Sequence, residues 1–393
     1  MGIARYRVPG QTAMLLVLLA AAAAVQVSAR RTTSDAELGQ PDFTTLTCNN
    51  PLLSPAQQLC HPTGVAVDNN SGLLFVADGD NNRILIWPSA AKFSNAEPAL
   101  VVLGQPDFAI GPKCSGGITA STICDPNGLV ADATGHLFVA DTDGDRILRF
   151  SPPFSNDMAA DMVIGQRDFN TSVCNADAGT LCHPRGVALD VNGNLFVADS
   201  NNNRLLVFEA PLTNGMSASL VIGQAGFNDK HCNRNGSPGP DTLCKPRGLV
   251  LDLAGNLYVA EDDNSRVLEF NDPLHSPSSA HIAASRVFGQ PDFFTTTCSV
   301  GPSGLCHPDD VALGTFGQLI VTDKDNNRLL VFHNPLTNNV ANQVFGQPDF
   351  FSNAPTTTAS GLAGPKGVVV DYARNLYVTD EDNNRVLRFD RVE

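Results

Sequence analysis

The sequence predicts an all-β protein: a six-bladed β-propeller of four-stranded antiparallel blades, with the ring closed by an N-terminal strand that joins the last blade. Three observations predict this fold. The 393 residues include 33 Gly and 26 Pro, and no long stretch has helical periodicity. Three short motifs recur six times, about 57–66 residues apart. The repeat pattern also starts and stops partway through a unit. Four-stranded sheets repeated around a centre form a propeller.

The three motifs follow one another in a fixed order. Gly-Gln-Pro-Asp-Phe or a near copy begins at Gly39, Gly104, Gly165, Gly223, Gly289 and Gly346. The second motif, Pro-x-Gly-Val-Ala-Val-Asp in its fullest form, begins at Pro62, Pro126, Pro184, Pro246, Pro308 and Pro365. The third, Leu-Phe-Val-Ala-Asp with an Asn-rich turn, ends at Arg83, Arg146, Arg204, Arg266, Arg328 and Arg385.

The first complete repeat contains four candidate strands: Val65–Asp68, Leu73–Ala77, Ile84–Trp87 and Leu100–Leu103. Gly, Asn and Asp residues separate the first three, as hairpin turns require. Both faces of the strands are apolar, so we expect the sheets to stack face to face. A fourth-strand motif at Leu38–Phe43 precedes the first repeat, and the last repeat stops after its third strand, Val386–Phe389. Pairing of these two segments would close the ring and remove its open edge.

The first residues are predicted to be a secretory signal peptide. Arg5 and Arg7 precede an apolar run from Ala13 to Val25, and Val27-Ser28-Ala29 suits cleavage after Ala29. A helix needs about 20 apolar residues to span a bilayer, and this run is shorter, so no membrane span is expected. The predicted boundaries are 1–29 for the signal peptide, 30–36 for a short linker and 37–393 for the propeller. The protein is expected to be secreted or periplasmic.

The motifs resemble the NHL repeat family over residues 37–393. Its signature is visible in Pro184-Arg-Gly-Val-Ala-Leu-Asp190, Asn194-Leu-Phe-Val-Ala-Asp199 and Asn202-Asn-Arg-Leu-Leu-Val-Phe208. The resemblance implies a propeller. It leaves function open, because the family includes binding platforms, RNA binders and a few lyases.

Charge narrows the choice of partners. The chain has 25 Lys and Arg against 40 Asp and Glu, a net charge of −15. Nucleic acids and anionic membranes need clustered cations, so neither is an expected partner. We expect a monomer whose partner is a protein, a peptide, a glycan or a small molecule.

Ten cysteines fall in the loops that join the fourth strand of one repeat to the first strand of the next. Five of these loops hold one pair each, and Phe351–Gly364 holds none. Repetition favours disulfides within each loop over zinc or thiol chemistry, since an exported protein meets an oxidising environment. The expected pairs are Cys48–Cys60, Cys114–Cys124, Cys174–Cys182, Cys232–Cys244 and Cys298–Cys306.

These cysteine loops and the Asn-rich turns are expected on one face of the ring, the top face, because the strands alternate in direction. An acid and an Arg recur there in every repeat: Asp78 and Arg83, Asp141 and Arg146, Asp199 and Arg204, Glu261 and Arg266, Asp323 and Arg328, and Asp380 and Arg385. They could form acid–cation binding sites, but their presence in every blade favours a structural brace for the hairpin. Asp141–Asp145 resembles the start of a calcium loop, yet Arg146 and Pro152 stand where an EF-hand needs Gly and Glu.

Departures from the repeat point to candidate binding residues. The residue before the second-motif Pro is, in chain order, His61, Asp125, His183, Lys245, His307 and Gly364. Because the first strand of each blade is innermost, three histidines on alternating blades could hold one divalent cation, Zn or Ca, at the mouth of the central channel. Alternatively, each His packs against its own disulfide loop and points away from the axis.

The residue after that Pro forms a second ring: Thr63, Asn127, Arg185, Arg247, Asp309 and Lys366. Its three cations could receive a carboxylate or another anion at the channel mouth. Alternatively, they could form a solvated rim or pair with Asp309 and neighbouring acids. Blade five is irregular, because Asp310 replaces the usual Gly and Gly314 the usual Asp. The candidate ligand-binding residues are therefore Arg185, Arg247, Lys366, Asp309, Asp125 and Lys245.

Two functions fit these features. The favoured one is a binding or scaffold module that takes a peptide, glycan or small ligand on the top face. The alternative is a metal-dependent lyase or hydrolase using His61, His183 and His307. Within the family, Cys60-His-Pro-Thr-Gly-Val-Ala66 is similar to peptidyl-hydroxyglycine amidating lyases, but Tyr258, Tyr372 and Tyr377 are not expected near that site.

Overall fold

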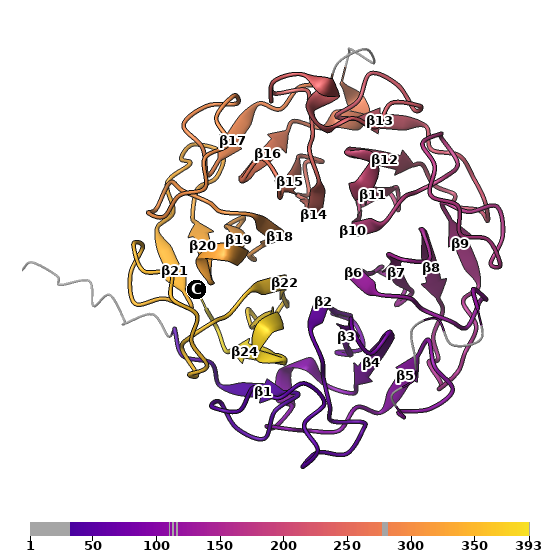
Figure 1. The fold of residues 1–393 in the computed structure, drawn as a ribbon, viewed down its shortest axis with the longest axis vertical. Helices are drawn as coiled ribbons and strands as arrows, with labels where there is room; N and C mark the ends of the chain where they lie inside the picture. The colour runs from indigo at the N-terminus through magenta and orange to yellow at the C-terminus, as the bar shows by residue number, and fades with distance from the viewer. Residues whose placement is uncertain (1–31, 110, 112–113, 115–116, 277–281, 393) are drawn as a thin grey trace, which may run out of the picture. The chain divides into compact units, whose positions relative to one another are not determined.

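The computed structural model describes residues 32–109, 111, 114, 117–276 and 282–392. Within them the strands form six antiparallel four-stranded sheets arranged as the blades of a propeller (Figure 1). The first strand of each blade lies nearest the centre of the ring and the fourth lies at its rim. The predicted fold class is thus confirmed. The predicted signal peptide lies outside the described residues.

The blades follow the chain in order. Blade 1 contains β2 (Pro62–Val67), β3 (Leu74–Asp78), β4 (Arg83–Trp87) and β5 (Val101–Leu103). Blade 2 contains β6 (Pro126–Ala131), β7 (Leu137–Asp141), β8 (Arg146–Phe150) and β9 (Met162–Ile164). Blade 3 contains β10 (Pro184–Leu189), β11 (Leu195–Asp199), β12 (Arg204–Phe208) and β13 (Leu220–Ile222). Blade 4 contains β14 (Pro246–Leu251), β15 (Leu257–Glu261), β16 (Arg266–Phe270) and β17 (Arg286–Phe288). Blade 5 contains β18 (Pro308–Leu313), β19 (Leu319–Asp323), β20 (Arg328–Phe332) and β21 (Gln343–Phe345). Blade 6 contains β22 (Pro365–Val370), β23 (Leu376–Asp380), β24 (Arg385–Phe389) and β1 (Ala36–Leu38).

Short 3₁₀ helices punctuate the connections: η1 (Ala90–Lys92), η2 (Ser200–Asn202), η3 (Cys232–Asn235), η4 (Pro273–His275), η5 (Lys324–Asn326) and η6 (Glu381–Asn383). In the part of the chain that the structure describes, no helix is long and apolar enough to cross a membrane.

The first strands begin earlier than predicted, at the motif proline. In β2 the register shifts between Pro62 and Val65, so the strand bulges at its top end and continues to Val67. The third strands also begin one residue early, because Arg83 pairs with Asp78 across the turn. The fourth strands are only three residues long, as suits the outer edge of a blade.

The ring closes through β1, which pairs antiparallel with β24 (Figure 1). Leu38 lies opposite Val386, and the backbone N–H of Asp35 donates to the carbonyl of Arg388 at 2.7 Å. The strand ends at Leu38, earlier than the predicted Leu38–Phe43, because Gly39 turns out of the ladder with a φ of +92°. Closure by the N-terminal strand is confirmed.

The apolar core lies between neighbouring blades. The second strands are fully buried on both faces, so each sheet packs against the sheets on either side. Phe288 of blade 4 and Phe332 of blade 5, for example, meet edge to face with ring centroids 5.2 Å apart. Burying a Leu or Phe side chain contributes about 1.5–3 kcal/mol, so these inter-blade layers supply most of the ring's stability.

All ten cysteines are described, and they form five disulfides within their own loops. The pairs are Cys48–Cys60, Cys114–Cys124, Cys174–Cys182, Cys232–Cys244 and Cys298–Cys306. Each spans only 8–12 residues of chain. The predicted pairing is confirmed.

Candidate functional site

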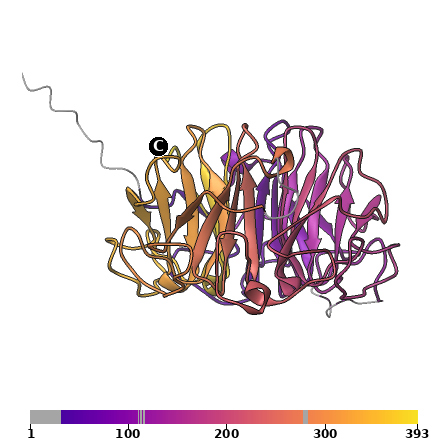
Figure 2. The ribbon, with the colours of Figure 1, turned by 90° about the horizontal axis from the view of Figure 1, so that it is seen from above.

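The cysteine loops and the Asn-rich turns share one face of the ring, as predicted. In blade 1, Nη2 of Arg83 donates to the carbonyls of Pro55 and Gln58 in the preceding cysteine loop, at 3.1 and 2.9 Å. Loops crowd the two opposite faces of the ring, and the strands run between them (Figure 2). We keep the name top face for the face with the cysteine loops, and call the other the bottom face.

The repeated acid and Arg form a buried brace. Both side chains of the Asp78–Arg83 pair are fully buried, with Nε 2.8 Å from Oδ2. The other oxygen of Asp78 accepts the backbone N–H of Cys60 at 2.8 Å. Burial raises the pKa of Asp78 although Arg83 opposes the change. The same arrangement recurs in all six blades. It ties each hairpin to its loop and presents no free charge to a ligand.

The calcium-like segment is one of these braced turns. Asp141 is fully buried against Arg146, and Oδ1 of Asp145 accepts the backbone N–H of His183 at 2.9 Å. Oδ1 of Asp143 lies 3.3 Å from Nε2 of His183. Asp141 therefore pairs with Arg146, while Asp143 and Asp145 both contact His183, so the three carboxylates do not converge as ligands of one ion.

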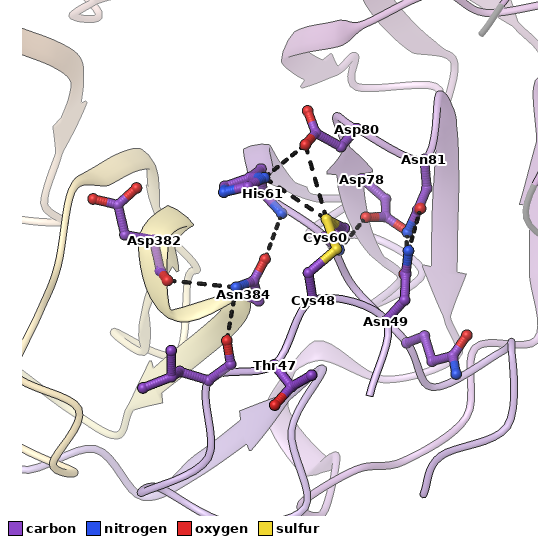
Figure 3. The surroundings of a disulfide bond; sticks show 12 residues. Thr47, Cys48, Asn49, Cys60, His61, Asp78, Asp80, Asn81, Asp382 and Asn384 are labelled. Atoms are coloured by element: carbon purple, nitrogen blue, oxygen red, sulfur yellow. Dashed lines mark hydrogen bonds and ion pairs between the residues drawn. A yellow bond between two sulfur atoms is a disulfide. The ribbon is translucent and has the colours of Figure 1, made fainter. Parts of the chain in front are cut away.

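The residue before each motif proline links two blades. Its φ lies between 47° and 57° in all six blades, a left-handed conformation that is uncommon outside glycine. In blade 1 the backbone N–H of His61 donates to Oδ1 of Asn384 from blade 6 at 2.9 Å (Figure 3). Corresponding bonds join the other blades. The backbone of this position therefore links each blade to the preceding one, whichever side chain the position carries.

The three histidines each face a different carboxylate. Nδ1 of His61 lies 2.6 Å from Asp80 (Figure 3), and Nδ1 of His307 lies 2.8 Å from Asp262. Among the described residues, each group of three or more nearby metal-ligand atoms contains only one of the three histidines. The cysteines in those groups are in disulfides. A cation held jointly by the three histidines stays a prediction.

The central channel is a cavity of about 740 Å³. Thr63, Asn127, Arg185 and Asp309 line it toward the top face. Below them five glycines and Asp310 form a neck, where a Cβ atom at Gly64 would collide with the carbonyl of Asn127. Apolar residues of the innermost strands line most of the remainder, and Asp252 and Thr315 lie among the turn residues at its lower end. A volume of this size is typical of small-ligand sites.

Of the three predicted cations in the second ring, two are neutralised. Arg247 donates from Nε to Oδ2 of Asp262 at 2.9 Å, and Nζ of Lys366 lies 2.5 Å from Oε1 of Glu381. Lys245, which precedes the motif proline of blade 4, donates to Oδ1 of Asn201 at 2.5 Å. Burial lowers the pKa of Lys245. Arg247 and Lys366 thus pair with the neighbouring acids Asp262 and Glu381. A ligand role for these cations stays a prediction.

Arg185 differs from these cations. It is half-buried and lines the channel, and its side chain has no hydrogen bond or ion pair with any described residue. Burial lowers the pKa of Arg185, and the like charge of Arg247 adds to that effect, while Asp309 and Asp125 oppose it. Its guanidinium is therefore a partly desolvated charge with free donors.

Asp310 places a carboxyl group in the neck. Its Oδ1 accepts the backbone N–H of Val311 at 2.8 Å, and its Oδ2 accepts that of Val368 in blade 6 at 3.0 Å. Burial, together with the nearby charge of Asp309, raises the pKa of Asp310 to about 7. The sequence marked this position as irregular, but its depth and its raised pKa come only from the structure.

One feature of the channel escaped the sequence prediction. Exposed apolar side chains lie on the turns between the first and second strands of four blades, where turn residues are expected to be polar: Val191, Leu253, Phe316 and Tyr372. Of these, Leu253 and Tyr372 line the channel. Comparison of equivalent turn positions would have found Val191, Leu253 and Tyr372, since blade 1 has Asn69 there. Phe316 lies one position later, where blade 1 has Asn70. Tyr258 and Tyr377 are buried in second strands.

Comparisons with known proteins agree with this architecture. The NHL repeat model matches residues 59–87, 181–208 and 305–332. Teneurin-3 of Mus musculus is 23% identical over 342 residues, which are 83% of this chain but 12% of that protein. A solved protein of unknown function from Bacteroides thetaiotaomicron has a TM-score of 0.54 and 14% identity, over 85% of this chain and 70% of that one. Virginiamycin B lyase of Staphylococcus aureus has a TM-score of 0.46 and 13% identity, over 85% and 95%. Identities this low indicate the fold alone.

Proposed function

The protein is a six-bladed β-propeller of NHL repeats, and we propose that it is an exported binding module that holds a carboxylate-bearing ligand in its central channel. The observation that carries the proposal is Arg185. It lines the 740 Å³ cavity, and no described residue neutralises it directly. Export is supported by the five disulfides, which persist in oxidising compartments.

The chemistry of Arg185 favours a carboxylate. Guanidinium groups bind carboxylates through two parallel N–H···O bonds, and such charge-assisted bonds are about twice as strong as neutral ones. The side chain has already lost part of its hydration, so an incoming anion recovers energy that water no longer supplies. Asp309 beside it favours the charged form of Arg185 without filling its donors.

The test is titration calorimetry with a panel of carboxylates and their uncharged amides. We expect wild-type protein to bind carboxylates and to discriminate against the amides. Arg185→Gln should weaken binding by at least about tenfold, as loss of a charge-assisted bond requires. Arg167→Gln is the matched control, because that side chain is 81% exposed. Equal affinity of wild type and Arg185→Gln would overturn the proposal.

The metal-dependent lyase or hydrolase remains the alternative function. Its support is the sequence pattern of His61, His183 and His307, and each of these lies beside a carboxylate that could share an ion. Elemental analysis of the purified protein tests it, together with a triple alanine variant of the three histidines. A stoichiometric transition metal that the variant loses would favour the enzyme over the binding module.

A further inference from the structure

The channel changes in chemical character along its length. Its top end carries the charged and polar groups described above. Farther down, half-buried apolar side chains of the innermost strands line it on five consecutive blades: Val130, Leu189, Leu251, Leu313 and Val370. Side chains that face an open channel are usually polar, because exposed apolar surface costs about 25 cal/mol per Å². This wall is suited to an apolar ligand chain.

The apolar surface continues onto the bottom face. Leu253 is 90% exposed and Tyr372 79% exposed, and both line the lower mouth of the channel. Phe316 lies on the intervening turn of blade 5 and is 71% exposed, with the guanidinium of Arg374 5.9 Å from its ring centroid. Exposed apolar side chains that lie beside a cavity often mark a ligand-binding site.

The two ends are separated by the length of one strand. Arg185 is the second residue of β10 (Pro184–Leu189), and the turn bearing Val191 follows that strand directly. Six residues of strand span about 20 Å. A ligand that touches both ends must therefore be long, thin, anionic at one end and apolar along the rest.

We propose that the channel binds an unbranched acyl carboxylate, whose headgroup meets Arg185 and whose chain runs down the apolar wall to Leu253 and Tyr372. This inference rests on the proposed function and names its ligand class. Glycans do not match the lower wall, because their hydroxyl groups would lose water without gaining partners there. A peptide C-terminus attached to apolar residues shares the acid and the apolar chain, and it is the competing source.

The experiment is a chain-length series of acetate, octanoate and dodecanoate, titrated below their micelle concentrations. Each methylene buried in the channel should tighten binding by up to about fourfold. Dodecanol, which lacks the acid, should bind more weakly than dodecanoate, and Arg185→Gln should remove that difference.

Two variants test where the acyl chain of the ligand lies. Leu251→Asn in the wall should weaken dodecanoate binding by at least tenfold while leaving acetate binding unchanged. Leu253→Asn at the rim tests the same contact on a 90% exposed side chain whose replacement does not threaten folding. Leu100→Asn is the matched control, since Leu100 is 64% exposed and lies outside the channel.

The outcomes separate this inference from the proposed function. If acetate and dodecanoate bind equally and both depend on Arg185, the acyl-chain assignment is wrong and the carboxylate site stands. If no carboxylate of any length binds, both proposals are wrong. If a peptide with an apolar, free C-terminus binds more tightly than dodecanoate, the site recognises a peptide end and the acyl-chain assignment is overturned.

Discussion

The strand that closes the ring carries a buried acid where the other blades have valine. Glu37 lies in the middle of β1, and its counterparts in the other blades are Val102, Val163, Val221, Val287 and Val344. Its side chain is fully buried; Oε2 lies 3.5 Å from Nη1 of Arg385, and Oε1 has no hydrogen-bond partner among the described residues. Burial raises the pKa of Glu37 from 4.5 to about 7, although Arg385 opposes the change. We predict that Glu37→Val stabilises the protein at pH 8.

The magnitude follows from that change in pKa. Between about pH 4.5 and 7 the folded protein keeps a proton on Glu37 that the unfolded chain has released. Stability therefore is highest below pH 4.5 with respect to this group, and it is lost as the pH rises through 7. About 2.5 pKa units at about 1.4 kcal/mol each amount to about 3–4 kcal/mol. Arg385 keeps its bond to Asp380 in the variant, so no new unpaired charge arises.

The assay is urea denaturation from pH 5 to 8.5 for wild type, Glu37→Val and Glu37→Gln. Asp141, Asp199 and Asp323, whose pKa values burial raises to about 6, also titrate in this range, so only the difference between wild type and variant reports Glu37. That difference should grow with pH and reach up to about 3–4 kcal/mol. Glu209→Gln, on an exposed side chain, is the control. A difference that stays constant with pH would refute the assignment of the raised pKa to Glu37.

Three further predictions follow from the same structure. Arg204→Met should cost about 3–5 kcal/mol in urea denaturation, because it leaves fully buried Asp199 without its cation; a loss below 1 kcal/mol would contradict the role of the brace. Deletion of Ala36–Phe43 should sharply lower the melting temperature, since it removes the β1–β24 ladder and the carbonyl of Phe43 that accepts from Arg385; melting like the intact chain would contradict closure. Carboxylate affinity should fall by up to about tenfold from pH 6 to 8 as Asp310, with a pKa of about 7, gains charge in the neck. Calorimetry at both pH values should show that Asp310→Asn removes this dependence, and an unchanged dependence would contradict it.

Sequence repetition predicted what is common to all blades. The acid–Arg brace and the shared top face recur in all six units and the disulfide in five, so one consistent geometry had to explain all copies of them. Strand bounds were predicted less well, because the bulge after Pro62 and the turn at Gly39 depend on backbone conformation, which residue type only partly determines.

Charge pairing in the channel mouth could not be predicted from the sequence. Arg185, Arg247 and Lys366 occupy equivalent positions and have similar side chains. They differ in the turn residue beside them: blade 4 offers Asp262 and blade 6 offers Glu381, while blade 3 offers Ser200. The sequence contains those residues, but only the folded hairpin shows that they face the cations.

The departures from sixfold repetition gather on one side of the ring. Blades 3 to 6 carry the charges of the second ring, and the same blades carry the exposed apolar turns at the bottom mouth. Blades 1 and 2 have Thr63 and Asn127 in the second ring, and Asn69 and Ala133 on the turns. Stability of the ring would be served equally well by six identical blades, because the braces and the core layers are common to all. Differences that coincide at both ends of one channel therefore favour a single elongated ligand lying against blades 3 to 6.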